Sequence, residues 1–223
     1  LRYNKIVRDL VEDTHLRPQD LIYPIFVCEG SNIKNEINSM PGQFQVSIDN
    51  LSSICNRLLD LNVKSVILFG VPDKKDGEGK VAQDENGIVQ RAVQEIKKIN
   101  SDILVIVDLC HCQYTTHGHC GTIENGDVDN DKTCELLARQ ALSHAEAGAD
   151  IVAPSGMIDG MVGAIRKGLD QGGYQSLSLF GERARRELAG QARDRRGRRT
   201  ACRRRGHPLR RIGRGHGGRQ EAD

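Results

Sequence analysis

Four short apolar runs, separated by stretches of helical periodicity, decide what this chain can fold into. The runs are rich in branched residues and read LIYPIFV (21–27), SVILFGV (65–71), ILVIVDL (103–109) and DIVAP (150–154). Continuous apolar runs of this length are typical of parallel strands that are buried on both faces. Strands that alternate with helices predict an α/β architecture, either a doubly wound sheet or a barrel, and periodicity does not choose between the two.

The segments between and after these runs predict four helices, because apolar residues recur on one face at a spacing of three or four. We expect the third helix to begin at Asn130 or Asp131 as its cap and to stop at Gly148. The four helical patterns cover residues 48–59, 88–99, 130–148 and 160–169.

After Ser176 both the periodicity and the composition change. Residues 1–176 carry 17 Lys+Arg and 25 Asp+Glu, whereas residues 177–223 carry 15 and 5, and all 15 of these cations are arginine. Residues 177–223 hold too few aliphatic residues to offset the entropy of ordering them. We therefore predict two regions: an α/β domain over 1–176, with its parallel sheet confined to residues before about 176, and a disordered, irregular Arg/Gly-rich tail over 177–223.

This Arg-rich tail has two interpretations. It is either genuine or the product of a shifted reading frame, and the abrupt loss of lysine favours the second. A genuine tail could bind nucleic-acid phosphates through charge alone, although no aromatic residue that could stack on a base follows Phe180. A zinc-binding, non-enzymatic module with a basic nucleic-acid-binding tail is therefore kept as the alternative hypothesis.

The segment DLCHCQYTTHGHCG (108–121) contains three of the seven cysteines. Cys110 and Cys112 are two apart at the end of a predicted strand, so we expect their side chains to project from one face. Cys120 follows after a loop long enough to fold back. Three thiolates suit Zn²⁺ at about 2.3 Å each, and a fourth position left open is typical of a catalytic metal. The pattern predicts a metal site at the carboxyl end of a strand, where α/β folds place their sites.

The other cysteines and the neighbouring histidines are not expected to belong to the three-cysteine metal site. His111 is expected to point away from the metal, and His119 either orients a ligand or binds another ion. No signal-peptide pattern opens the sequence and no apolar run approaches about 18 residues, so we expect a reduced, cytoplasmic compartment. Isolated core or surface thiols are expected at Cys28, Cys55, Cys134 and Cys202.

The cysteine segment resembles the zinc-binding segment of the porphobilinogen synthase family, also called 5-aminolevulinate dehydratase. Further blocks that resemble the family follow one another in family order from about residue 8 to Ser176. These blocks are DLIYPIFVCEG, SMPGQFQVSIDNL, VILFGVPDKKDGEGKVA, GIVQRAVQEIK, LLARQALSHAEAGADIVAPS and DGMVGAIRKGLDQGGY.

The resemblance implies a lyase of tetrapyrrole (heme) biosynthesis that condenses two molecules of 5-aminolevulinate into porphobilinogen with loss of two waters. Residues 1–176 would be the first half, about four βα units, of a (β/α)8 TIM barrel in a homo-oligomer. The resemblance also implies Zn²⁺ as Lewis acid and Mg²⁺ as a candidate accessory ion; the lack of a long apolar run predicts no membrane partner. The implied metal ligands are Cys110, Cys112 and Cys120, and the implied lining residues are Asp108 and Ser155.

The chain departs from the family pattern in one respect that concerns catalysis. The family uses two Schiff-base lysines, in a Ser-Tyr-Ser-x-Lys segment and a later Val-Lys-Pro segment, and neither segment occurs in this sequence. The last lysine is Lys167, which lies in the fourth predicted helix and is expected to be solvated. Gly156 and Met161 also stand where the family pattern has an Asp and an Arg. We therefore expect the carboxyl-terminal half to be missing or frame-shifted, and this chain to be inactive as it stands.

Overall fold

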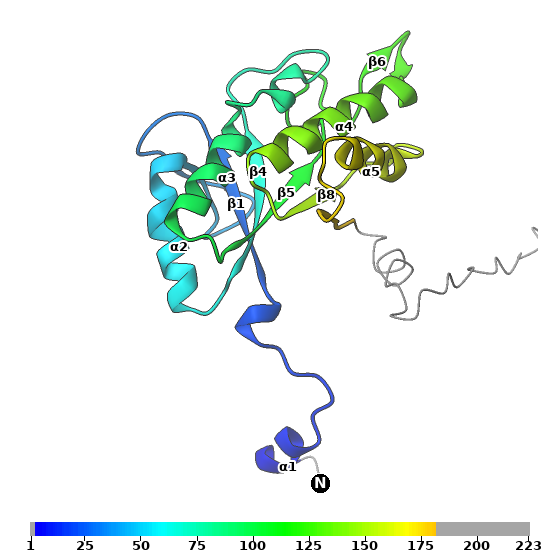
Figure 1. Ribbon diagram of the computed structural model, residues 1–223. Coiled ribbons are helices and arrows are strands. Elements are labelled where there is room, and N and C mark those ends of the chain that lie inside the picture. Colours follow the sequence, from blue (N-terminus) through cyan, green and yellow to red (C-terminus); the bar gives the residue numbers. More distant parts are fainter. Residues whose placement is uncertain (1–2, 182–223) are drawn as a thin grey trace, which may run out of the picture. The chain divides into compact units, whose positions relative to one another are not determined.

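A mostly parallel sheet of seven strands organises residues 3–181, the part of the chain that the computed structural model describes (Figure 1). The strand order is β2-β3-β1-β4-β5-β8-β9, and every neighbouring pair is parallel except β2 with β3. Two further short strands, β6 and β7, form a separate antiparallel hairpin. The strands are β1 (Ile22–Cys28), β2 (Lys34–Glu36), β3 (Phe44–Ser47), β4 (Ser65–Val71), β5 (Leu104–Leu109), β6 (Ile123–Glu124), β7 (Asp127–Val128), β8 (Ile151–Pro154) and β9 (Ser178–Leu179).

Helices alternate with the main strands, which confirms the predicted α/β architecture. The four predicted strands correspond to β1, β4, β5 and β8, and the four predicted helices correspond to α2, α3, α4 and α5. A further six-residue helix, α1, precedes the sheet in the sequence and has no buried residue. The helices are α1 (Lys5–Leu10), α2 (Leu51–Asp60), α3 (Ile88–Ile99), α4 (Asn130–Glu146) and α5 (Met161–Gln171), and three short 3-10 turns cover Pro18–Asp20, Ile48–Asn50 and Lys80–Gln83.

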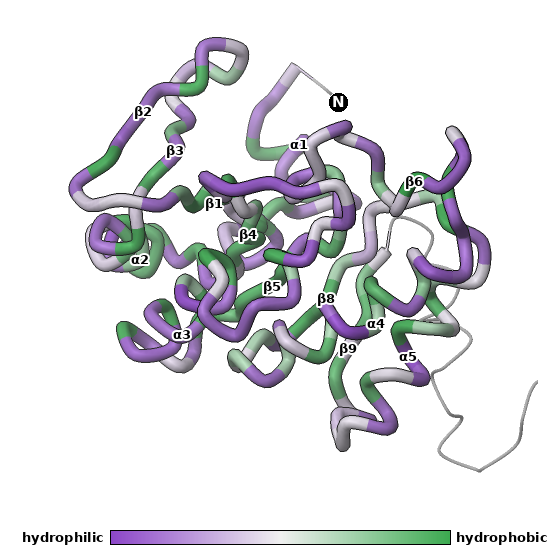
Figure 2. The backbone as a smooth tube through the Cα atoms, turned by 90° about the horizontal axis from the view of Figure 1, so that it is seen from above, coloured by the Kyte–Doolittle hydropathy of each residue, from purple (hydrophilic) through white to green (hydrophobic). Residues whose placement is uncertain are grey.

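Helices α2 to α5 pack on one face of the sheet. Successive residues of a strand point to opposite faces, and every second residue of the central strands enters one buried cluster with the helices. Figure 2 shows the hydrophobic residues gathered along these strands and the hydrophilic ones along the outer loops. The strand residues in the cluster are Ile25, Val27, Val46, Val66, Leu68, Val105, Val107, Leu109 and Val152, and the helix residues include Leu58, Ile96, Leu137 and Ile165.

The sheet extends past residue 176, so the prediction that it ends there was wrong. Ser178 and Leu179 of β9 pair with the edge of β8, and the Phe180 N–H donates to the Val152 carbonyl at 2.9 Å. The guanidinium of Arg166 in α5 donates to the carbonyls of residues 174 and 177, both at 2.6 Å. This side chain holds the turn that leads the chain back to β8, a contact between distant parts of the sequence that periodicity does not reveal.

Helix α4 begins one residue earlier than the cap prediction placed it. Asp129 is the N-cap, and its carboxylate accepts the N–H of Lys132 at 3.0 Å. The predicted cap Asn130 instead exchanges two hydrogen bonds with the backbone of Asp159, at 3.0 and 2.9 Å. The predicted stop is confirmed, because Gly148 lies just beyond the last helical residue with a positive φ of 99°.

Residues 182–223 lie outside the described residues, and with them most of the predicted Arg-rich tail, including Cys202. Among the helices that are described, none has the length and apolar character needed to cross a membrane.

Candidate metal centre

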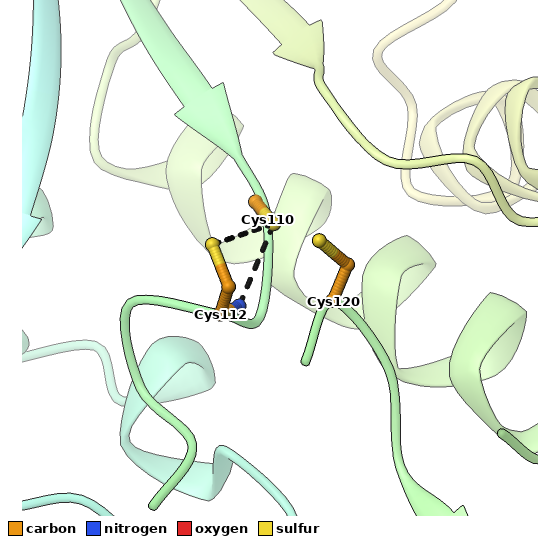
Figure 3. A group of neighbouring side chains, drawn as sticks. All are labelled: Cys110, Cys112 and Cys120. Atoms are coloured by element: carbon orange, nitrogen blue, oxygen red, sulfur yellow. Dashed lines mark hydrogen bonds between the residues drawn. The ribbon is translucent and has the colours of Figure 1, made fainter. Parts of the chain in front are cut away.

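The three cysteines of the predicted metal site meet beyond the carboxyl end of β5. Their sulfur atoms lie within 4.8 Å of one another, and those of Cys110 and Cys112 are 3.1 Å apart. Figure 3 shows the three side chains facing a common point, with Cys120 arriving from the returning loop. Cys110 is buried, whereas Cys112 and Cys120 are partly exposed. Within the described part of the chain, this is the one group of three or more His, Cys, Asp or Glu side chains with converging ligand atoms.

A turn, and not the alternation of a strand, brings Cys110 and Cys112 together. Strand β5 ends at Leu109, and the carbonyl of His111 accepts the N–H groups of Tyr114 and Thr115 at 2.9 and 3.0 Å. The turn reverses the chain directly after Cys110, so the sulfur of Cys110 also lies 3.5 Å from the N–H of Cys112. The two cysteines are therefore close for a different reason from the one that the spacing suggested.

Cys120 returns to this turn because its loop is fastened to the loop that follows β4. Asp76 donates its N–H to the Tyr114 carbonyl at 3.2 Å, and its carbonyl accepts the N–H of Thr116 at 3.0 Å. The Asp76 carboxylate in turn accepts two N–H groups of its own loop, those of residues 78 and 80, at 2.7 and 3.1 Å. The hydroxyl of Thr115 donates to the His119 carbonyl at 3.1 Å. These bonds fix the path of the chain on both sides of the sulfurs.

The electrostatics of the cluster fit a bound cation. Burial raises the pKa of the thiols of Cys110 and Cys120 to about 11, and the neighbouring thiols make smaller contributions in both directions. Burial also raises the pKa of Cys112. Without a cation the thiols would stay protonated at neutral pH. A divalent ion would stabilise the thiolates and release protons on binding. Three converging sulfur donors are the set that a soft or borderline metal prefers.

Asp108 and Ser155, the predicted lining residues, lie beside the cluster on adjacent strand ends. Asp108 is 7% exposed, and its carboxylate accepts hydrogen bonds from the Gln113 amide and the Ser155 hydroxyl. Burial is the largest influence and raises its pKa, while the two hydrogen bonds act in the opposite direction. Ser155 directly follows β8, and its N–H donates to the Leu109 carbonyl at 3.3 Å.

The other residues singled out from the sequence do not join the sulfurs. His111 is fully buried, and burial lowers its pKa to about 4. His119 is exposed and lies beside His117, with 5.5 Å between the ring centroids. Lys167 is exposed on α5. The remaining described cysteines lie apart from the cluster: Cys28 and Cys55 are buried, and Cys134 is partly exposed.

Sequence analysis gave no role to Gln113 or Asp76, which both make several hydrogen bonds next to the cluster. The position of Gln113 directly after Cys112 was the one signal that could have drawn attention to it.

Comparison with known proteins gives consistent matches. The family model described as delta-aminolevulinic acid dehydratase matches residues 1–185. Proteins named delta-aminolevulinic acid dehydratase are similar to the chain: that of Staphylococcus epidermidis is 50% identical over 182 residues, and that of Halalkalibacterium halodurans is 49% identical over 180. These matches cover 81% of this chain and 56% and 55% of the relatives. The chain therefore spans about half the length of the curated relatives it matches.

A solved structure is similar as well. It is the Toxoplasma gondii delta-aminolevulinic acid dehydratase (porphobilinogen synthase) in complex with the reaction product porphobilinogen. The TM-score is 0.77 at 34% sequence identity, and the match covers 81% of this chain and 52% of that one.

Proposed function

The chain belongs to the delta-aminolevulinic acid dehydratase family, and on that basis we propose that it is the metal-binding portion of a porphobilinogen synthase. This lyase would condense two molecules of 5-aminolevulinate into porphobilinogen with loss of two waters, a step of tetrapyrrole biosynthesis. The observation that carries the proposal is the convergence of three cysteine sulfurs at the carboxyl end of a parallel sheet. That edge is where α/β folds hold their active sites.

The sheet and helices would form the first part of a (β/α)8 barrel. Strands β1, β4, β5 and β8 are adjacent in sequence order and all parallel, as consecutive barrel strands are. The likeness to about half of the Toxoplasma gondii structure supports the same view.

The metal would be Zn²⁺, held by Cys110, Cys112 and Cys120. Thiolate ligands favour zinc over magnesium, which prefers oxygen donors. When bound, the metal would supply Lewis-acid polarisation of a substrate oxygen. Asp108 and Ser155 would line the substrate pocket beside it, where the buried carboxylate presents a hydrogen-bond acceptor that the Ser155 hydroxyl and the Gln113 amide hold in place. Mg²⁺ as an accessory ion follows from the family resemblance. His119 would either orient a zinc ligand or bind another ion.

These 223 residues would not complete the reaction alone. A Schiff base forms from a neutral amine, so a catalytic lysine needs a lowered pKa. Lys80 begins the 3-10 turn that follows β4, and Lys132 lies in the first turn of α4; Glu78 raises the pKa of both. Lys167 is exposed on the outer helix α5. No lysine follows it in the sequence.

The remaining expectations follow from the family. The substrate would be 5-aminolevulinate, the compartment the cytoplasm, and the partners further copies of the same chain. The alternative of a zinc-binding module that contacts nucleic acid is not favoured, because the model of an enzyme family matches residues 1–185.

Complementation tests this proposal. The chain is mixed with the carboxyl-terminal portion of the Staphylococcus epidermidis relative, the part beyond the matched 182 residues, and porphobilinogen formation from 5-aminolevulinate is measured. We expect none from either piece alone and a measurable rate from the mixture. Cys112→Ala should abolish that rate, whereas Cys134→Ala, which removes a partly exposed thiol outside the cluster, should preserve it.

Borohydride trapping checks the missing lysines separately. With 5-aminolevulinate and borohydride, mass spectrometry should find no adduct on this chain. A specific adduct on Lys167 or another lysine would show that the chain carries a Schiff-base residue of its own.

A further inference from the structure

The side chain of Gln113 connects the cysteine turn to two different strands. Its amide oxygen accepts the N–H of Gly70 in β4 at 3.0 Å, and its amide nitrogen donates to the carboxylate of Asp108 in β5. Gln113 directly follows Cys112, so both bonds act on the backbone that carries this cysteine. The Gln113 side chain therefore bridges the ends of β4 and β5, with its amide oxygen bonded to one strand and its amide nitrogen to the other.

The gap between these two strand ends exists because the two ladders of β4 have different lengths. β4 pairs with β1 as far as Val71, but with β5 only as far as Leu68. The N–H of Gly70 lies beyond the end of the β4–β5 ladder and is accepted by a side chain in place of a strand carbonyl. An unpaired N–H at a buried strand end costs stability. The Gln113 amide accepts this N–H and so adds one hydrogen bond beyond the end of the β4–β5 ladder.

The same strand end is shaped to receive the turn closely. A Cβ atom at Gly70 would lie 2.7 Å from the Tyr114 hydroxyl oxygen and 2.8 Å from a methyl carbon of Val89. Tyr114, the residue after Gln113, is 2% exposed. The turn thus packs against β4 at a distance that only glycine permits, and it has little freedom to shift.

We propose that Gln113 is a positioning residue for the metal centre, which holds the Cys110–Cys112 turn in register with β4 and β5. The inference rests on the proposed metal-binding function and adds a residue to it. Gln113 binds no metal. It fixes the backbone between Cys110 and Tyr114, so that two sulfurs 3.1 Å apart are preset before an ion arrives. Groups that orient metal ligands in this way commonly change metal affinity by about 10–100-fold.

Gln90 provides a matched control far from the cysteines. It is 1% exposed, and its amide nitrogen also makes two hydrogen bonds, to the Ala82 carbonyl and the Ser143 hydroxyl, both at 3.0 Å. Gln90→Leu and Gln113→Leu each remove two hydrogen bonds from a buried or partly buried glutamine. They differ in whether those bonds hold the cysteine turn.

The test measures Co²⁺ binding to the full chain through the thiolate-to-cobalt charge-transfer absorption, with urea unfolding of each variant alongside. We expect Gln113→Leu, and Gln113→Met as a second variant of similar length, to weaken Co²⁺ binding by about 10–100-fold. Gln90→Leu should shift the urea midpoint without changing Co²⁺ affinity. Asp108→Asn keeps an acceptor for the Gln113 amide and should retain affinity within a few-fold.

Each outcome decides a different question. Unchanged affinity in Gln113→Leu and Gln113→Met would overturn the positioning role while leaving the metal centre standing. An equal loss in Gln90→Leu would mean that the affinity follows general stability, which also overturns it. An equal loss in Asp108→Asn would assign the effect to the Asp108 charge and not to the bridge. If the unaltered chain binds no Co²⁺, the proposed metal centre and the proposed role of Gln113 are both overturned.

Discussion

The two ends of the sheet differ in how well their buried polar groups are paired. At the amino end, the ammonium group of Lys97 donates to the Asp150 carboxylate at 2.6 Å and to the Ile103 carbonyl at 2.8 Å. The same carboxylate oxygen accepts the Val105 N–H at 2.7 Å. One ion pair therefore joins α3, the start of β5 and the start of β8, and each of its charged groups has further partners.

The carboxyl end instead contains groups that its surroundings leave unsatisfied. Three thiols with raised pKa values converge there. Both ring nitrogens of the buried His111 and the hydroxyl of Thr122 have no hydrogen-bond partner among the described residues. Such groups cost stability. This difference supports the proposal that the carboxyl end binds a ligand while the amino end stabilises the fold, the division expected of parallel α/β proteins.

The largest effect is expected when a thiol at the carboxyl end is removed. Cys112→Ala should weaken Zn²⁺ binding about a thousand-fold, roughly 4 kcal/mol, because one of three ligands is lost. Equilibrium dialysis with a competing chelator measures it. Cys55→Ala is the control: this core thiol is fully buried, and its loss should lower stability without changing zinc affinity. Equal effects on zinc affinity would contradict the assignment of the metal ligands.

Acid should lower the stability of the fold through a buried histidine in α4, the helix that links the two ends. His144 of α4 is fully buried without a partner for its ring among the described residues, and burial lowers its pKa from 6.5 to about 4. As the pH falls below 6.5 the unfolded state takes up the proton first, so stability should decline between pH 6.5 and 4 by up to about 3 kcal/mol.

Urea unfolding as a function of pH measures this decline. His144→Leu removes one of two buried histidines with a lowered pKa, so the decline over the same interval should become shallower. The remaining slope would include His111, whose pKa burial also lowers to about 4. A curve of unchanged slope in this variant would show that other groups cause the acid sensitivity.

The sequence predicts the framework of both ends but not the bonds that distinguish them. Four strands and four helices follow from local periodicity, because buried strands and one-sided helices leave local patterns. The spacing of the three cysteines also predicts that they meet, although a turn and not strand alternation brings Cys110 and Cys112 together. The cap at Asp129, the pairing of β9 and the bridge made by Gln113 depend on residues that are distant in sequence. Asn130, for example, is as good a cap as Asp129 by residue type, but Asp159 engages its side chain.

At the amino end, Lys97→Met should destabilise the fold by about 2 kcal/mol, because it leaves the Asp150 charge without its ionic partner. The value lies below that of a fully buried pair, since the two side chains are 21% and 33% exposed and water screens part of the interaction. The adjacent Lys98 is the control. Its pair with Glu95 is 3.5 Å long with the lysine 72% exposed, so Lys98→Met should change the urea midpoint little.

Lys97→Met also tests whether the two ends of the sheet act independently, through its effect on zinc affinity. Lys97→Met should leave zinc affinity unchanged in the folded chain, because its contacts lie at the opposite end of the sheet from the sulfurs. A parallel loss of zinc affinity would mean that the two ends are coupled and are not separate in role.

The smallest effect is expected from the ion pair at the carboxyl end, Lys132 with Glu78. The distance is 2.8 Å, as short as a good buried pair, but the side chains are 42% and 36% exposed. Solvent screening makes such pairs contribute little to global stability, so Lys132→Gln should leave the urea midpoint unchanged within error.

The local effect of Lys132→Gln should still be measurable. Hydrogen bonds and charges from Lys132 and Lys80 lower the pKa of Glu78 to about 2. With Lys132 removed, the pKa of Glu78 should rise toward its ordinary value of 4.5 without reaching it, because Lys80 remains 2.7 Å away. An NMR titration of the Glu78 carboxyl carbon follows the change. A urea midpoint that falls as far as in Lys97→Met would erase the difference between the two ends, since an exposed pair beside the metal loop would then stabilise the fold as much as the half-buried one.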